Sequence, residues 1–154
     1  MEIVEIEKDY GELGRLMDGL AREVVAGLTK WYRLPLEPEI TWVRWEAGRL
    51  GFVTATETDF WLKGGPDFSR WRIYLVANKL QAHPVAITHV VSHEVAHLHQ
   101  SLRDGRILSR HEEERYAEME ARFHCRRLGR DSYCPVCAVP LGEFLRAYGN
   151  PATT

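Results

Sequence analysis

Residues 84–104, PVAITHVVSHEVAHLHQSLRD, constrain the fold of this chain more than any other stretch. Apolar residues recur along it at helical spacing and form one stripe: Ile87, Val91, Val95, Leu98 and Leu102. Pro84 suits the first turn of a helix, and the dipeptide DG at 104–105 suits its end. His93 and His97 fall on another side, about 40° apart on a helical wheel. The pattern therefore predicts a helix that buries one face and presents two histidines on another.

The chain has 154 residues, of which 45% are apolar and 27% charged, and its formal net charge is −2. This length predicts a single domain, residues 1–154, with a core that needs no disulfides. The charge gives no reason to expect nucleic acid as a partner. No apolar run reaches the roughly 18 residues of a membrane span, and the acidic N-terminus does not resemble a signal peptide. We therefore expect a cytoplasmic protein with no membrane association, of undetermined oligomeric state.

The remaining patterns predict an α+β fold with the order α-β-β-β-α-α. Residues 9–32 repeat apolar positions at helical spacing, and Asp9 with Glu12 suits a capping pair at the helix start. Residues 40–46 and 50–62 are rich in β-branched and aromatic residues, which is typical of strands. A third strand, RWRIYLV at 70–76, alternates two sets, Trp71, Ile73 and Leu75 against Arg72 and Tyr74.

A further helix follows the HEVAH helix. It is predicted to begin near Ser109, where SRHE has the form of a capping box, and to end near Leu128, before Gly129. Residues 130–154 then form a short tail that carries the cysteine pair CPVC and a short last helix.

The HEVAH segment has the residue types of a metal site. His93 and His97 are one helical turn apart, so their imidazoles can bind one ion. Zn²⁺ with three protein ligands keeps a fourth position for water and lowers the pKa of that water to about 7. Glu94 can reach such a water, accept its proton as a general base and pass it to a leaving amine. The alternative is that both histidines are ordinary helix residues.

This segment resembles the HExxH signature of the zincin metallopeptidases, and the resemblance covers roughly residues 40–128. It implies a minimal zincin-like domain that uses zinc to hydrolyse peptide bonds in a peptide or protein substrate. In that superfamily a strand upstream of the active-site helix pairs with extended substrate. Residues 70–76 occupy this place in the sequence, so substrate is expected to add as a strand along them.

The zincin branches differ in the third metal ligand. The metzincin pattern requires a glycine and a histidine where this chain has Gln100 and Arg103, which excludes that branch. The gluzincin pattern takes a glutamate from the next helix, where ERYAEMEA places four residues on one face: Glu114, Ala117, Glu118 and Ala121. The gluzincin resemblance implies that Glu114 joins His93 and His97 as a zinc ligand. Glu118, one turn further along, would orient a histidine ligand.

Two other third ligands stay open. Glu118 has the more usual gluzincin spacing from His97. His111 is implied by a resemblance to SprT-like zincins, which combine HExxH with a third histidine and often a later cysteine-based zinc ribbon. HEVAH, His111 and CPVC occur in that order here, and this second resemblance implies a protease that acts near DNA.

The three cysteines suggest a second metal site. Cys134 and Cys137 form CPVC, whose spacing is typical of a zinc knuckle, and Cys125 or His124 could add a ligand. A structural zinc ion, a disulfide and free thiols are all open interpretations.

The function has one competing class. A non-catalytic or regulatory protein could use the same three residues to hold a structural metal. If the chain is an enzyme, four residues are candidates to stabilise the oxyanion: Tyr116, His99, Tyr133 and Tyr148.

Overall fold

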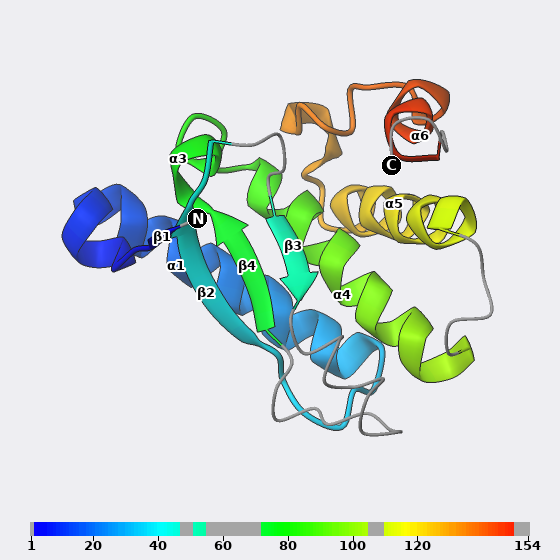
Figure 1. Cartoon of the computed structure of the whole chain (residues 1–154), viewed down its shortest axis with the longest axis horizontal. Helices are drawn as coiled ribbons and strands as arrows, with labels where there is room; N and C mark the ends of the chain where they lie inside the picture. The colour runs from blue at the N-terminus through cyan, green and yellow to red at the C-terminus, as the bar shows by residue number, and fades with distance from the viewer. Residues whose placement is uncertain (1, 47–50, 55–71, 105–109, 150–154) are drawn as a thin grey trace.

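The computed structural model describes residues 2–46, 51–54, 72–104 and 110–149, which form a mixed α/β architecture (Figure 1). The elements in chain order are β1 (Glu2–Ile3), α1 (Ile6–Trp31), β2 (Glu39–Arg44), β3 (Gly51–Thr54), β4 (Arg72–Val76), α3 (Ala77–Leu80), α4 (Ala86–Asp104), α5 (Arg110–Arg127), the 3-10 turn η2 (Asp131–Tyr133) and α6 (Leu141–Gly149). The mixed architecture was predicted. The order α-β-β-β-α-α is only approximate, because it lacks the short elements β1 and α3.

The described strands form one sheet in the order β1-β2-β4-β3. β2 and β4 are parallel, with Ile40 opposite Ile73, whereas β1 and β3 are antiparallel to their neighbours. β4 therefore has a hydrogen-bonded strand on each side. The expectation that substrate adds along residues 70–76 is wrong, because both edges of this strand are already paired. Among the described strands on that side of the sheet, β3 is the edge strand.

The alternation predicted for residues 70–76 agrees with the burial of β4. Ile73 and Leu75 are fully buried and Arg72 is exposed, while Trp71 lies outside the described residues. The strand expected at 50–62 is described only as Gly51–Thr54. Such alternation arises because successive side chains of a strand point to opposite faces of the sheet.

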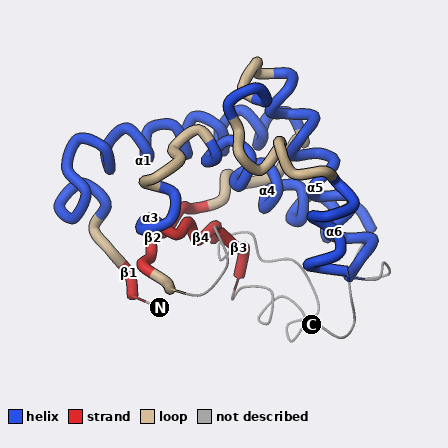
Figure 2. Tube along the Cα trace, turned by 90° about the horizontal axis from the view of Figure 1, so that it is seen from above, coloured by secondary structure: helices blue, strands red, loops and turns tan. Residues whose placement is uncertain are grey.

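The long helices lie on one side of the sheet (Figure 2). The core between these layers is built from α1, β4, α3 and α4, and its members include Met17, Val25, Leu28, Ile73, Leu75, Leu80, Ile87, Val91 and Val95. Burying each of these large side chains contributes about 1.5–3 kcal/mol. Among the described residues, no helix is long and apolar enough to cross a membrane.

Helix α1 begins earlier than predicted and is interrupted. Gly11 has φ 60° and ψ −137°, a conformation that glycine adopts easily, and it kinks the helix. The predicted Asp9–Glu12 capping pair is wrong. The carboxylate of Asp9 instead accepts the backbone N–H of Glu5 at 3.0 Å, at the true helix start.

Helices α4 and α5 pack side by side (Figure 1). α4 carries the HEVAH segment, and α5 carries Glu114 and Glu118. The predicted stripe of α4 is buried, with Leu102 only partly so. On α5, three residues of the predicted face, Ala117, Glu118 and Ala121, are fully buried, and so is Cys125 one turn further along. The two alanines keep this face small, so polar side chains on the two helices can approach one another.

The end of α5 turns the tail back towards α4. Gly129 has φ 71°, the N–H of Gly129 donates to the carbonyl of Arg126 at 3.0 Å, and the N–H of Arg130 donates to that of Cys125 at 2.7 Å. These two bonds form a Schellman motif, which a glycine in the left-handed region favours. The helix therefore ends close to where it was predicted to end, at Arg127, and Leu128 is 39% exposed. The expected start at Ser109 lies outside the described residues.

Candidate metal sites

The first candidate site joins two histidines of α4 to one glutamate of α5. His93 Nε2 lies 3.1 Å from His97 Nε2 and 3.0 Å from Glu114 Oε2, and His97 Nε2 lies 3.2 Å from Glu114 Oε1. Nitrogen and oxygen ligands of a tetrahedral zinc ion are about 3.3 Å apart, given bonds of about 2.0–2.1 Å. The three side chains could therefore hold a metal ion with little rearrangement.

The three candidates for the third ligand lie in different places. Glu114 faces the same nitrogen atoms of His93 and His97 that face each other. Glu118 contacts the opposite nitrogen of His93, Nδ1, at 3.1 Å. His111 is exposed and does not belong to the group. Of the three, only Glu114 lies where it could share an ion with both histidines.

Glu118 is a fully buried carboxylate with three partners. Its Oε1 lies 2.7 Å from His89 Nε2 and 2.9 Å from Arg122 Nε, and its Oε2 lies 3.1 Å from His93 Nδ1. Burial raises its pKa, but the hydrogen bonds with His89 and His93 outweigh burial and lower the pKa to about 2. An ionised carboxylate only accepts, so both imidazoles donate N–H groups to it.

The ionisation of the first site suits a ligand set. Burial lowers the pKa of His93, but hydrogen bonds with Glu114 and Glu118 raise it overall to about 10. Burial raises the pKa of Glu114, and hydrogen bonds with His93 and His97 more than reverse this, so the pKa lies well below its ordinary value. Glu114 is therefore ionised at neutral pH, and a metal ion that binds His93 displaces a proton.

Glu94 follows His93 on α4 and is 8% exposed. Its negative charge is close enough to raise the pKa of His93. The residue predicted as general base is therefore largely buried and lies beside the first site.

The second candidate site gathers all three cysteines around His89. Its Nδ1 lies 3.1 Å from Cys137 Sγ, 3.5 Å from Cys134 Sγ and 3.7 Å from Cys125 Sγ. A nitrogen and a sulfur ligand of one tetrahedral zinc ion are about 3.5 Å apart. The three cysteines are free thiols and form no disulfide. These four residues could also hold a metal ion.

The cysteines of this group were predicted from the sequence, whereas His89 was not. The available signal was its position four residues before His93, which repeats the spacing of His93 and His97. His124, the other proposed addition, lies elsewhere, because its Nε2 is 2.6 Å from the hydroxyl of Tyr32.

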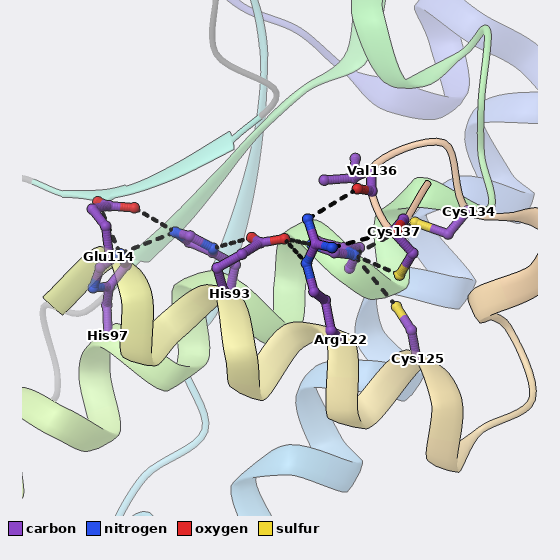
Figure 3. A network of polar contacts seen from close by, with 10 residues as sticks. His93, His97, Glu114, Arg122, Cys125, Cys134, Val136 and Cys137 are labelled. Carbon is purple, nitrogen blue, oxygen red and sulfur yellow. Dashed lines mark hydrogen bonds and ion pairs between the residues drawn. The ribbon is translucent and has the colours of Figure 1, made fainter. Parts of the chain in front are cut away.

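Arg122 attaches the CPVC turn to this network. Its Nη1 and Nη2 donate to the carbonyls of Cys137 and Val136, both at 3.4 Å, while its Nε donates to Glu118. Figure 3 shows the resulting row of contacts, which runs from His97 and Glu114 at one end to the cysteines at the other.

Two of the oxyanion candidates, Tyr116 and His99, contact each other. The hydroxyl of Tyr116 lies 2.9 Å from His99 Nδ1 and 3.4 Å from Glu120, in a separate polar cluster. Tyr133 is 79% exposed, and the side chain of Tyr148 lies outside the described residues. A ring that does lie near the site is that of Phe144 on α6, whose centroid is 6.0 Å from that of His93.

Comparisons with known proteins identify no relative. No family model matches the chain, and neither the curated proteins nor the solved structures contain a match.

Proposed function

We propose that this protein is a zinc-dependent metallopeptidase of the zincin type, with His93, His97 and Glu114 as zinc ligands. The observation that carries the proposal is the convergence of these three side chains, with Glu94 next to them on α4. Two histidines and a glutamate form one of the ligand sets of catalytic zinc, and a set of three leaves a fourth position open. Imidazole ligands favour zinc over calcium or magnesium, which prefer oxygen.

The residues of the chain then have separate roles. His93, His97 and Glu114 would hold a zinc ion, which when bound would lower the pKa of a water and polarise a substrate carbonyl. Glu94 accepts the proton of the attacking water and delivers it to the leaving amine. Glu118 holds His93 in the tautomer whose Nε2 is free to bind the metal, because it accepts the Nδ1 proton.

The sheet offers a place for an extended substrate. β3 is antiparallel to β4 and packs beside α4, the helix that carries Glu94 (Figure 1). Among the described strands, β3 has a neighbour only in β4, so its other edge can pair with a peptide backbone. β3 thus takes the role that the sequence assigned to residues 70–76.

Removal of the metal tests the proposal. The zinc-loaded chain is expected to cleave a mixed library of internally quenched peptides or unfolded casein. A chelator should abolish this cleavage because the attacking water loses its activation, and added zinc should restore it whereas magnesium should not. The measurement is the initial rate of fluorescence increase at fixed protein concentration. Cleavage that survives complete removal of zinc, or a zinc-loaded chain that cleaves no probe, would overturn the proposal.

A further inference from the structure

We propose that His89, Cys125, Cys134 and Cys137 bind one structural zinc ion, and that Glu118 couples this site to the site at His93, His97 and Glu114. The first half stands independently of any activity. The second half rests on metal binding at the site of the proposed function.

The second group has the chemistry of a closed zinc site. One imidazole nitrogen and three sulfurs make a complete tetrahedral set, which leaves no position for water or substrate. Cys125 is fully buried, Cys134 is 2% exposed and His89 is 1% exposed. The His89 Nδ1–sulfur distances of 3.1–3.7 Å lie around the value expected across one zinc ion. Cys137 is partly exposed, and a largely buried site whose four ligands all come from the protein is structural rather than catalytic.

The carboxylate of Glu118 connects the two sites through two imidazoles. His89 points Nδ1 at the sulfurs and Nε2 at Glu118 Oε1, whereas His93 points Nε2 at Glu114 and Nδ1 at Glu118 Oε2. A carboxylate behind a metal-bound histidine fixes its tautomer and ring orientation. Here one buried carboxylate serves one histidine of each site, so the orientation of either ring constrains the other.

The buried charges also favour occupancy of both sites. Two zinc ions and the guanidinium of Arg122 would carry five positive charges, against six negative ones from the three thiolates and the carboxylates Glu94, Glu114 and Glu118. Buried charges that lack a partner are costly. A site that loses its ion takes up protons in its place. Because Glu118 contacts one histidine of each site, this change in charge reaches both sites, which gives a second physical reason for coupling.

The structural site also positions the tail. Cys134 and Cys137 lie just before α6, and Arg122 binds the carbonyls of the CPVC turn that leads to it. α6 packs against α5 and brings Phe144 close to His93. A metal ion that holds the turn therefore also holds the helix beside the first site.

Cobalt substitution tests the structural site without any assay of activity. Co²⁺ bound to thiolates absorbs strongly in the near ultraviolet through charge transfer, whereas Co²⁺ bound to imidazole and carboxylate does not. We expect this absorption in wild type and in His97→Ala, where it should saturate with one cobalt ion per chain, and a clearly weaker band in Cys137→Ser, which removes one of the three thiolates. Absence of the band from the reduced wild-type chain would refute the structural site whatever the fate of the peptidase proposal.

The coupling is tested by Glu118→Gln. A glutamine has one acceptor oxygen, so it cannot accept N–H groups from both histidines through separate oxygens. Competition with a fluorescent zinc chelator is expected to show affinity about 10–100-fold weaker at both sites. Glu120→Gln is the matched control, since Glu120 lies on the same helix but accepts hydrogen bonds from Tyr32 and Tyr116, and it should leave both affinities unchanged. Weakening at one site only, or at neither, would refute the coupling.

If Glu118→Gln folds poorly, a second pair of variants tests the coupling between the two sites. Coupling between two binding sites is reciprocal. Cys137→Ser should therefore weaken zinc binding at His93 and His97, and His97→Ala should weaken binding at the cysteines by the same factor, about 5-fold or more. If the zinc affinity of each site is unchanged by the substitution in the other site, Glu118 does not couple them.

Discussion

Replacing Glu94 with glutamine is expected to lower kcat/KM for peptide hydrolysis by roughly 10²–10⁴-fold while the chain keeps its zinc. The amide has nearly the shape of the carboxylate but cannot accept the proton of the attacking water. Glu94 is not a member of the ligand group, so metal binding should not depend on it. Hydrolysis and zinc content are to be measured on the same preparation. A loss of hydrolysis without a loss of zinc distinguishes a general base from a metal ligand.

The control for this variant is Glu113→Gln, which removes a carboxylate next to Glu114 without touching the ligand group. It should retain both zinc and activity. A Glu94→Gln chain that hydrolyses peptides at the wild-type rate would remove Glu94 from the mechanism. In that case the protein would belong with regulatory or structural metal-binding proteins.

Replacing Cys134 with serine is expected to produce a large loss of stability. Cys134 is buried among His89, Cys125 and Cys137, and its removal breaks the four-ligand set. An ion present at about 1,000 times its dissociation constant stabilises the folded state by about 4 kcal/mol. In a domain of this size that corresponds to a decrease of roughly 10 °C in Tm. Thermal unfolding followed by circular dichroism, with zinc and with a chelator, measures the effect.

A chelator also removes metal from the site at His93, His97 and Glu114, so the effect of that site on Tm must be measured separately. In a His97→Ala background, a chelator should still lower Tm, because the cysteine site is intact. In the double variant with Cys134→Ser, the chelator should have no further effect. Ser132→Ala, an exposed change in the same tail, should behave like its parent. A Cys134→Ser chain as stable as wild type in the presence of zinc would show that the cysteines bind no stabilising metal.

Local periodicity accounts for what the sequence predicted correctly. The buried stripe of α4, the inward face of α5 and the alternation of Ile73 with Leu75 each follow from spacing within one element. The wheel also placed Glu114 and Glu118 on one face. It could not say which nitrogen of His93 each glutamate would meet, since this depends on how the two helices pack.

The predictions that failed depended on contacts between distant parts of the chain or on the backbone conformation of a glycine. The position of β4 between β2 and β3 is a property of sheet topology, which the alternation within residues 70–76 does not contain. His89 lies 36 to 48 residues from its cysteine partners, so only its spacing to His93 hinted at a role. The kink at Gly11 replaced an expected helix start because glycine permits a positive φ there.

The most direct test of the account is the amount of zinc per chain, measured by elemental analysis on wild type and on His97→Ala, with hydrolysis assayed on the same samples. With two ligand groups among the described residues, wild type should contain about two zinc ions. His97→Ala should contain about one and should hydrolyse no peptide. A His97→Ala chain that retains the full zinc content and the activity of wild type would show that the site at His93, His97 and Glu114 is not the catalytic metal site.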